Sequence, residues 1–190
     1  ALPIFQGLDS YLRIFAVKIE QEVFFQEARS EDAEGFIALL HRGAEDSDFL
    51  ILDQDYFAGQ EAALGQVFDN SFQTSDSFYL LAKIGQKPIG ALTIKADGHP
   101  RMNHIGDLFM LVAKDCWNQG IGQILLEEGI RWAEETASIR RLELTVQKRN
   151  SPAVHLYEKF GFEIEGTKQR GAKTKDGEFL DVYLMGKLID

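Results

Sequence analysis

The chain has 190 residues, 45% of them hydrophobic, and a formal net charge of −10 at pH 7. This length and hydrophobic content suffice for one substantial core, so we expect a single domain spanning residues 1–190. Cys116 is the only cysteine, which excludes an intramolecular disulfide and leaves it as a small packing residue. No segment approaches the roughly 18 apolar residues that cross a bilayer, and the first residues lack the pattern of a secretory signal. We therefore expect a cytoplasmic protein without a membrane partner.

The negative charge is concentrated in the first half of the chain. Residues 1–100 contain 7 Lys and Arg against 16 Asp and Glu, whereas residues 101–190 contain 13 against 14. Nine of the acidic residues lie between positions 27 and 55. Such a surface argues against nucleic acid as a partner and favours a cationic one, although a solvated face that keeps the protein in solution explains the same pattern.

The first third of the chain predicts a strand followed by two helices. The strand is expected at residues 23–28, the first helix begins with Ser30 as its cap, and the second helix covers residues 60–68. Residues 1–20 are treated as an N-terminal extension, because the apolar residues at positions 12–19 fit a helix and a strand equally well.

A meander and a βαβ unit are predicted in the middle of the chain. Gly85-Gln-Lys87 is typical of a tight hairpin turn between two of three β-rich segments, which we expect to pair antiparallel. The third of these segments leads into a helix with a one-sided apolar stripe and then into a further strand. The five elements are expected at residues 78–84, 88–95, 104–112, 120–136 and 141–147.

The last quarter of the chain predicts a short helix and two strands. Ser151 as a cap and Pro152 in the first turn begin the helix, and Gly161 ends it. The strands are expected at residues 162–168 and 179–188. The predicted layout is therefore antiparallel first, parallel in the middle and antiparallel at the end.

Gly120 and Gly122 expose bare backbone where the helix of the βαβ unit begins. The first turn of a helix carries unpaired N–H groups and the positive end of the helix dipole, so an anion is the expected ligand. A P-loop is excluded, because Gly122 is followed by Gln123 and Ile124 rather than by lysine and a hydroxyl residue. A dinucleotide-binding fold is disfavoured, because Leu125 replaces the third glycine of its motif.

Two segments together carry a more specific signal. They are separated by one predicted helix and one predicted strand. The first is Trp117-Asn-Gln-Gly-Ile-Gly122 and the second is Asn150-Ser-Pro-Ala-Val-His-Leu-Tyr-Glu-Lys-Phe-Gly-Phe162. The pair resembles the acyl-CoA-binding core of the GNAT superfamily of N-acetyltransferases, particularly bacterial members related to ribosomal-protein N-terminal acetyltransferases. The resemblance covers residues 104–165 and departs at Trp117, where the family motif has Arg or Gln. It implies an α/β fold with a central mixed, mostly antiparallel sheet, a splayed parallel strand pair and flanking helices.

The resemblance implies acetyl-CoA as a cosubstrate and no metal. The backbone amides of the glycine turn would hold the pyrophosphate of the cofactor. The amide of Val112 would polarise the thioester carbonyl, and Asn150 would bond the cofactor arm. The residues implied in cofactor binding are Leu111, Val112, Asn118, Gln119, Gly120, Ile121, Gly122, Asn150 and Tyr157.

Tyr157 and Asp107 are the predicted catalytic residues. By resemblance, Tyr157 donates a proton to the leaving thiolate, a modest task because a thiol pKa of about 8.5 lies close to neutrality. Holding a primary amine with a pKa of about 10.4 neutral at pH 7 costs roughly 4.6 kcal/mol, so a base is useful. Asp107 lies where many relatives carry a glutamate and is our candidate base; its alternative role is a salt bridge at a strand edge.

The sequence thus predicts an N-acetyltransferase that passes an acetyl group directly from acetyl-CoA to a primary amine of a small molecule or a protein N-terminus. The acidic first half favours a cationic acceptor, and a homodimer is compatible with the sequence. Two alternatives stay open. One is a non-catalytic acyl-CoA-binding or sensing module on the same fold, and the other is an interaction domain in which the glycines only shape a helix end.

Overall fold

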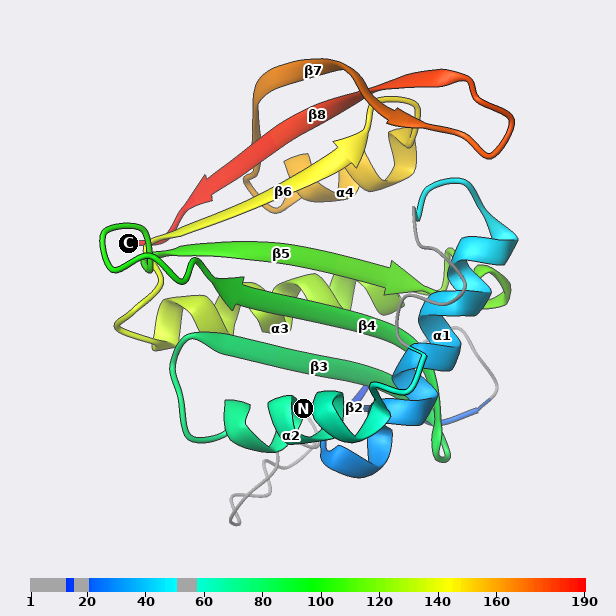
Figure 1. The fold of residues 1–190 in the computed structure, drawn as a ribbon. Coiled ribbons are helices and arrows are strands. Elements are labelled where there is room, and N and C mark those ends of the chain that lie inside the picture. Colours follow the sequence, from blue (N-terminus) through cyan, green and yellow to red (C-terminus); the bar gives the residue numbers. More distant parts are fainter. Residues whose placement is uncertain (1–12, 16–20, 51–57) are drawn as a thin grey trace.

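The computed structural model of the chain describes residues 13–15, 21–50 and 58–190. The strands in these residues form one sheet of eight strands in the order β1-β2-β3-β4-β5-β6-β8-β7. Helices cover both faces of the sheet, with α1 and α2 on one face and α3 and α4 on the other (Figure 1). The expected fold class, an α/β protein with a mixed and mostly antiparallel sheet, is confirmed.

The strands before the parallel pair form a continuous antiparallel array. Each strand from β1 to β5 pairs with the next one along the chain, as the meander prediction requires. Gly85 turns the hairpin between β3 and β4 with a φ of +57°. The bounds are β1 Arg13–Phe15, β2 Val23–Glu27, β3 Ser77–Ile84, β4 Lys87–Ala96 and β5 Ile105–Val112.

The remaining elements are two short 3-10 turns, four α-helices and three strands. The 3-10 turns are η1 Ser30–Asp32 and η2 Lys114–Cys116. The α-helices are α1 Ala33–Asp46, α2 Glu61–Ser71, α3 Ile121–Glu135 and α4 Ser151–Lys159. The strands are β6 Arg141–Gln147, β7 Glu163–Lys173 and β8 Phe179–Leu188.

Aromatic side chains anchor the helices to both faces of the sheet. Phe68 of α2 is fully buried and lies 5.1 Å from the ring of Tyr79 on β3 and 5.4 Å from that of Phe36 on α1. On the opposite face, Phe78 of β3 stacks on Trp132 of α3 at 5.1 Å. Because alternate residues of β3 point to opposite faces, this strand packs against helices on both sides of the sheet. Truncating Phe68 to alanine would cost about 3–5 kcal/mol of folding free energy.

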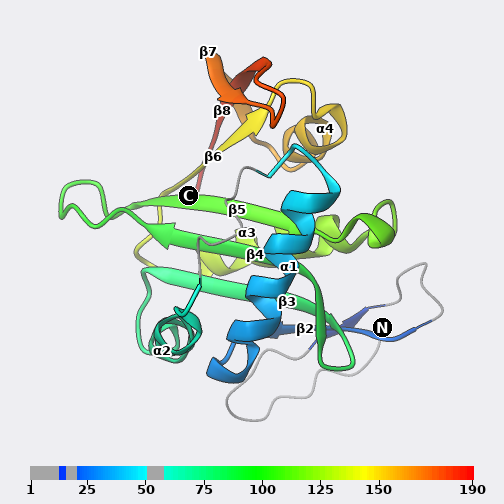
Figure 2. The same ribbon diagram turned by 45° about the vertical axis from the view of Figure 1, so that its right-hand side comes forward.

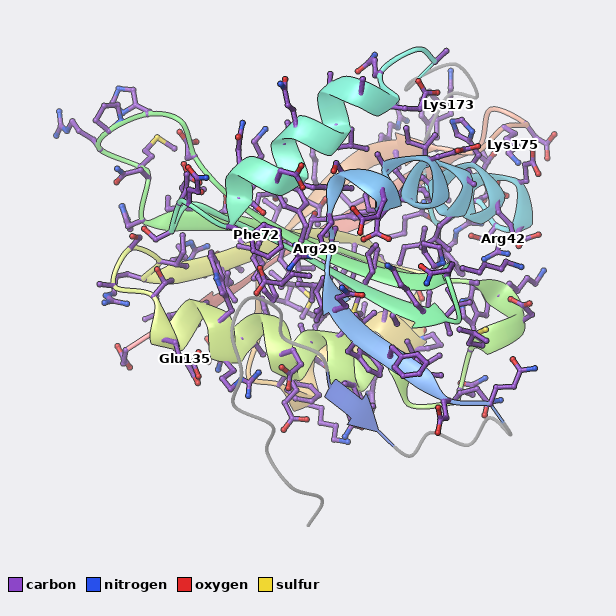
Figure 3. The ribbon with its side chains drawn as sticks, turned by 90° about the horizontal axis from the view of Figure 1, so that it is seen from below. Arg29, Arg42, Phe72, Glu135, Lys173 and Lys175 are labelled. Carbon is purple, nitrogen blue, oxygen red and sulfur yellow. The ribbon has the colours of Figure 1, made fainter. Side chains whose placement is uncertain are left out.

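Two predicted helix caps are wrong. Ser30 does not cap α1, because it lies inside η1, whose N-cap is Arg29; the third residue of this turn, Asp32, accepts a hydrogen bond from the Arg29 amide at 2.9 Å. Ser151 does not cap α4 either, since Asn150 holds that position. The guanidinium of Arg29 packs 5.1 Å from the Phe72 ring, which ties this turn to α2 (Figure 3).

Outside these caps the predicted elements agree with the structure, apart from two differences. The segment at positions 12–19, whose type was left open, contains β1 and otherwise lies outside the described residues. The strand predicted at 162–168 extends to Lys173 as β7, which forms an edge of the sheet and pairs with β8.

The parallel pair β5 and β6 separates along its length. The two strands are joined by α3 and pair only between Ile105–Asp107 and Arg141–Glu143. Beyond this point they diverge and leave a wedge between them (Figure 1). The expected splay is therefore present, and it creates the opening in which the candidate site lies.

Candidate functional site

The edge of β5 that faces the wedge carries backbone groups without a strand partner. Ala113 donates its amide to the Ile89 oxygen on β4 at 2.8 Å, so the odd-numbered residues of β5 direct their N–H and C=O groups to β4. The backbone N–H and C=O groups of Leu108, Met110 and Val112 consequently face the wedge. The Val112 oxygen accepts a hydrogen bond from Trp117 Nε1 at 2.7 Å, which leaves the Val112 amide facing the opening.

The glycine turn prepares the start of α3 for an anion. Gly120 has a φ of +89° and Asn118 a φ of +59°, two left-handed positions that fold the chain tightly before the helix. The first amide to bond within the helix belongs to Ile124, which donates to the Gly120 oxygen at 3.2 Å. The amides of Ile121 and Gly122 precede it at the positive end of the helix dipole, where an anion is stabilised.

The two glycines are needed for different reasons. A Cβ atom on Gly120 would meet nothing within 4 Å, so this position requires glycine for its φ alone. Gly122 has an ordinary backbone, and its Cβ would lie 3.5 Å from Leu156 on α4 and 3.7 Å from Met110 on β5. A side chain there would therefore occupy the space between the glycine turn, the wedge and α4.

α4 closes this space from the other side. Asn150 caps the helix by accepting a hydrogen bond from the Ala153 amide at 3.4 Å, and Pro152 fits the first turn. Tyr157 is only 6% exposed and packs edge-on against Phe162 at 5.8 Å. Burial raises the pKa of Tyr157 to about 12, so its hydroxyl keeps its proton at any physiological pH.

A cavity of about 840 Å³ joins these parts. It brings together most of the residues predicted to bind the cofactor: Leu111, Val112, Asn118, Gly120, Ile121, Gly122, Asn150 and Tyr157. Gln119 is not among the residues that line it. Cys116 lines the cavity as a buried free thiol, and burial is the main cause that raises its pKa.

The cavity passes through the wedge from one face of the sheet to the other. Met110 and Val112 point towards Gly122 on the α3 and α4 face. Leu111 points the opposite way, because its side chain meets Gly43 of α1. The cavity continues on this second face between the segment after α1 and the β7–β8 hairpin, and the residues that line it there include Ser47, Phe49, Leu50, Lys168, Val182 and Leu184.

Hydrogen bonds hold the segment after α1 at the mouth of the wedge. The buried side chain of Gln147, at the end of β6, donates from Nε2 to the Asp48 oxygen at 2.6 Å. Its Oε1 accepts a hydrogen bond from Arg149 Nε at 3.0 Å. The Arg149 guanidinium in turn lies 5.6 Å from the Phe49 ring, so both ends of the Gln147 amide are used.

Asp107 lies apart from the other predicted site residues. It sits in the paired part of β5, across from Lys95 of β4 and Glu143 of β6, and it is not among the residues that line the cavity. Desolvation, followed by the charge of Glu143, raises the pKa of its carboxyl group. The structure therefore does not bring Asp107 together with Tyr157.

Sequence reasoning missed the residues on the second face. Phe49, Gln147 and Lys168 come from three distant elements, and nothing in their local sequence connects them. Gly171 lies just beyond the strand predicted at 162–168, and such a glycine is a signal that could have indicated a bulge in that region.

Neither a metal site nor a membrane-spanning helix is present in the part of the chain that the structure describes. No group of three or more His, Cys, Asp or Glu side chains there is placed to hold a metal ion. No helix within the same residues is long and apolar enough to cross a membrane.

The fold and the site together define an acyl-CoA-dependent acyltransferase: a splayed parallel pair with free backbone groups, an anion-binding turn, and a cavity open on both faces. Similarity to known proteins supports this class. The profile of the acetyltransferase (GNAT) family matches residues 44–162, which is more than half of the chain. The chain belongs to the GNAT acetyltransferase family, as the two sequence segments indicated.

Individual relatives support the assignment. An acetyltransferase of the GNAT family from Streptococcus pneumoniae is 44% identical, with a TM-score of 0.83 over 88% of this chain and 99% of that one. L-amino acid N-acetyltransferase AaaT from Escherichia coli K12 is 37% identical over 109 residues, or 57% of this chain and 67% of that protein. The structure of yncA from Salmonella typhimurium with its cofactor acetyl-CoA shares the fold, with a TM-score of 0.75 and 14% identity over 88% of this chain and 94% of that one.

Proposed function

We propose that this acetyltransferase transfers the acetyl group of acetyl-CoA to the α-amino group of free L-amino acids. The observation that carries the proposal is the cavity that crosses the sheet through the wedge, because it lets a thioester on one face meet an amine from the other. The similarity to L-amino acid N-acetyltransferase AaaT supports the choice of acceptor.

The residues on the α3 and α4 face fit acetyl-CoA. The amides of the glycine turn would bind its pyrophosphate at the start of α3. The free backbone groups of Leu108 and Met110 would pair with the amide groups of the pantetheine arm, as an added strand pairs with a sheet edge. The absence of a side chain at Gly122 leaves room for this arm between β5 and α4.

The chemistry needs one donor at the carbonyl and one at the sulfur. The Val112 amide, which faces the wedge, would donate a hydrogen bond to the thioester carbonyl oxygen and make its carbon a better target. The neutral amine attacks this carbon, a C–N bond forms and the C–S bond breaks. Tyr157, whose raised pKa keeps it protonated, would give its proton to the departing sulfur.

No carboxylate among the described residues lines the cavity, so deprotonation of the amine has no immediate acceptor in this part of the chain. Water in the open cavity would then carry the proton away. Asp107 would act as the base only through such water, since its carboxyl group lies outside the cavity lining. A role for Asp107 therefore remains a prediction that mutation must decide.

An amine panel tests the proposal. Purified protein is incubated with acetyl-CoA and individual amino acids, peptides and polyamines, and the release of free thiol is followed. We expect turnover with amino acids that depends on both substrates. Binding of CoA, measured by calorimetry, without turnover on any amine would instead favour the non-catalytic sensing module. If acetyl-CoA at millimolar concentration did not raise the melting temperature, the acetyltransferase and the sensing module would both be excluded.

A further inference from the structure

The second face of the cavity carries an uneven distribution of charge. Among the described residues that line the cavity, Lys168 is the only one whose side chain is charged at neutral pH, and none is an aspartate or a glutamate. The walls around it are mostly apolar and include Phe49, Leu50, Leu111, Val182 and Leu184. A charged group on the acceptor would therefore meet one cation and hydrophobic surface.

The Gln147 amide, on the same face of the cavity, already has partners. Gln147 uses its Nε2 for the Asp48 oxygen and its Oε1 for Arg149, as described above. The Arg149 guanidinium is positioned over the Phe49 ring, which adds positive charge at the same mouth. A cationic acceptor, as the acidic first half of the chain suggested, would thus be repelled at this point of the cavity.

The pairing of β7 with β8 places Lys168 at the cavity, directly before a bulge. The pairing of β7 with β8 shifts between Lys168, which pairs with Val182, and Ala172, which pairs with Leu180, so β7 contains extra residues here. Paired residues on antiparallel strands share a face of the sheet, so Lys168 and Val182 both face the cavity that they line. Beyond the bulge, the tip of the hairpin hangs over the end of α1 (Figures 1 and 2).

This bulge is defined by specific contacts. Arg170 adopts a φ of +53°, and its amide donates to Asp181 Oδ1 at 3.0 Å. A Cβ atom on Gly171 would lie 2.5 Å from Val182 Cγ2 and 3.0 Å from the Lys168 oxygen, so only glycine fits. The backbone that carries Lys168 therefore has one well-defined path, as bulges next to binding sites commonly do.

We propose that Lys168 binds the carboxylate of the acceptor and that the apolar walls select an amino acid with an apolar side chain, such as leucine or phenylalanine. This inference rests on the proposed function and specifies its substrate class. Lys168 is exposed to solvent, so its pair with a carboxylate would make a modest contribution that salt weakens. The positive charge of Lys168 also lowers the pKa of the nearby amine, which favours the neutral form that attacks the thioester.

The test compares acceptors that differ at the carboxylate. L-leucine and L-leucinamide have the same side chain, but the amine of the amide is the weaker base, so the variants are compared by the change in the ratio of the two KM values. The diamine cadaverine serves as a cationic acceptor. With the wild-type protein we expect a KM for leucine up to about fivefold below that for leucinamide, the effect of one solvent-exposed ion pair. Lys168→Gln should raise the KM for leucine by about the same factor and leave that for leucinamide unchanged, with little effect on kcat.

A matched control lies on the same hairpin. Lys173 and Lys175 are exposed near its tip, at the end of the molecule where Arg42 of α1 also lies, and neither lines the cavity (Figure 3). Lys173→Gln should leave both KM values unchanged, which separates a local contact from a general effect of charge. Lys168→Glu should reverse the preference and favour cadaverine over leucine. The melting temperatures of all variants establish that they fold.

The outcomes separate this inference from the proposed function. Equal KM values for leucine and leucinamide in the wild type, or an equal rise of both in Lys168→Gln, would overturn the role of Lys168 while leaving acetyl transfer intact. Calorimetry with L-leucine in the presence of CoA gives a second measurement that needs no turnover. Binding that is lost in Lys168→Gln, in a protein that acetylates no amine, would support the contact and overturn the proposed function alone.

Discussion

Trp117 donates its indole N–H to the backbone oxygen of Val112 at 2.7 Å. This bond closes a short loop from the end of β5 to the start of the glycine turn and occupies the Val112 oxygen, while the Val112 amide still faces the wedge. The indole ring also lies against Phe49, with ring centroids 6.4 Å apart. A tryptophan at the first position of the motif, where the family has Arg or Gln, thus connects the cofactor turn to the acceptor face.

Replacing Trp117 with phenylalanine tests this connection, because it keeps an aromatic ring and removes the indole N–H. We expect the KM for acetyl-CoA to rise by about threefold to tenfold, since one neutral hydrogen bond is lost and the end of β5 is less fixed. Initial rates at varied acetyl-CoA measure the effect. Phe49→Ala serves as the comparison, because it removes the ring contact and keeps the hydrogen bond. If Trp117→Phe left the KM for acetyl-CoA unchanged, the hydrogen bond would have no part in positioning β5.

Tyr157→Phe tests the proton donor. We expect kcat to fall by about 10- to 100-fold, at the lower end for general acids, because a thiolate leaves without much help at neutral pH. The wild-type profile of kcat against pH should show no decline up to pH 10, because Tyr157 has a pKa of about 12 and stays protonated below it. A decline with a midpoint near pH 8 would contradict this assignment, and so would an unchanged kcat in the variant.

The two glycines of the turn should respond differently to alanine. Gly122→Ala has a compatible backbone and should fold at least as stably as the wild type, yet raise the KM for acetyl-CoA about tenfold, because its methyl group enters the cavity. Gly120→Ala should cost about 1–2 kcal/mol of folding free energy, because its φ of +89° is unfavourable for alanine. Thermal unfolding measures the stability of the two variants, and initial rates at varied acetyl-CoA measure their KM. A strong loss of stability in Gly122→Ala would show that the space near Leu156 is packing space rather than binding space.

Asp107→Asn tests the candidate base. Because the carboxyl group lies outside the cavity lining, we expect kcat to change by less than about twofold, far below the effect of losing a general base. The folded protein raises the pKa of this carboxyl, so its ionised form weakens the fold as the pH rises through that pKa. The asparagine variant should therefore melt no lower than the wild type at pH 7. A large fall in kcat together with a changed pH profile would instead establish Asp107 as the base acting through water.

Much of the fold could be predicted because its signals are local. The antiparallel meander, the βαβ unit and the helix that begins at Ser151 follow from hydrophobic periodicity, glycines and a proline within a few residues of each boundary. The two wrong caps show the limit of this reasoning. Ser30 and Ser151 are good capping residues, but Arg29 and Asn150 hold the cap positions, and the backbone path decides which residue does so.

The part of the cavity that we assign to the cofactor was accessible to sequence analysis for a similar reason. Gly120, Gly122, Asn150 and Tyr157 lie in two short motifs, and each motif forms one continuous piece of the cavity. The acceptor half is built from long-range contacts instead. Lys168 faces the cavity because it pairs with Val182 of β8, and Phe49 is held there by Gln147, almost a hundred residues further along. Neither arrangement leaves a local pattern.

The edge position of β7 has a consequence for how this enzyme can change. β7 pairs with β8 alone, at the margin of the sheet, while the parts that we propose to hold acetyl-CoA lie on β5, α3 and α4. With Lys168 in the proposed role, substitutions within the hairpin would alter the choice of amine and leave the thioester chemistry in place. Exchange of this hairpin for that of a relative would then change the acetylated product.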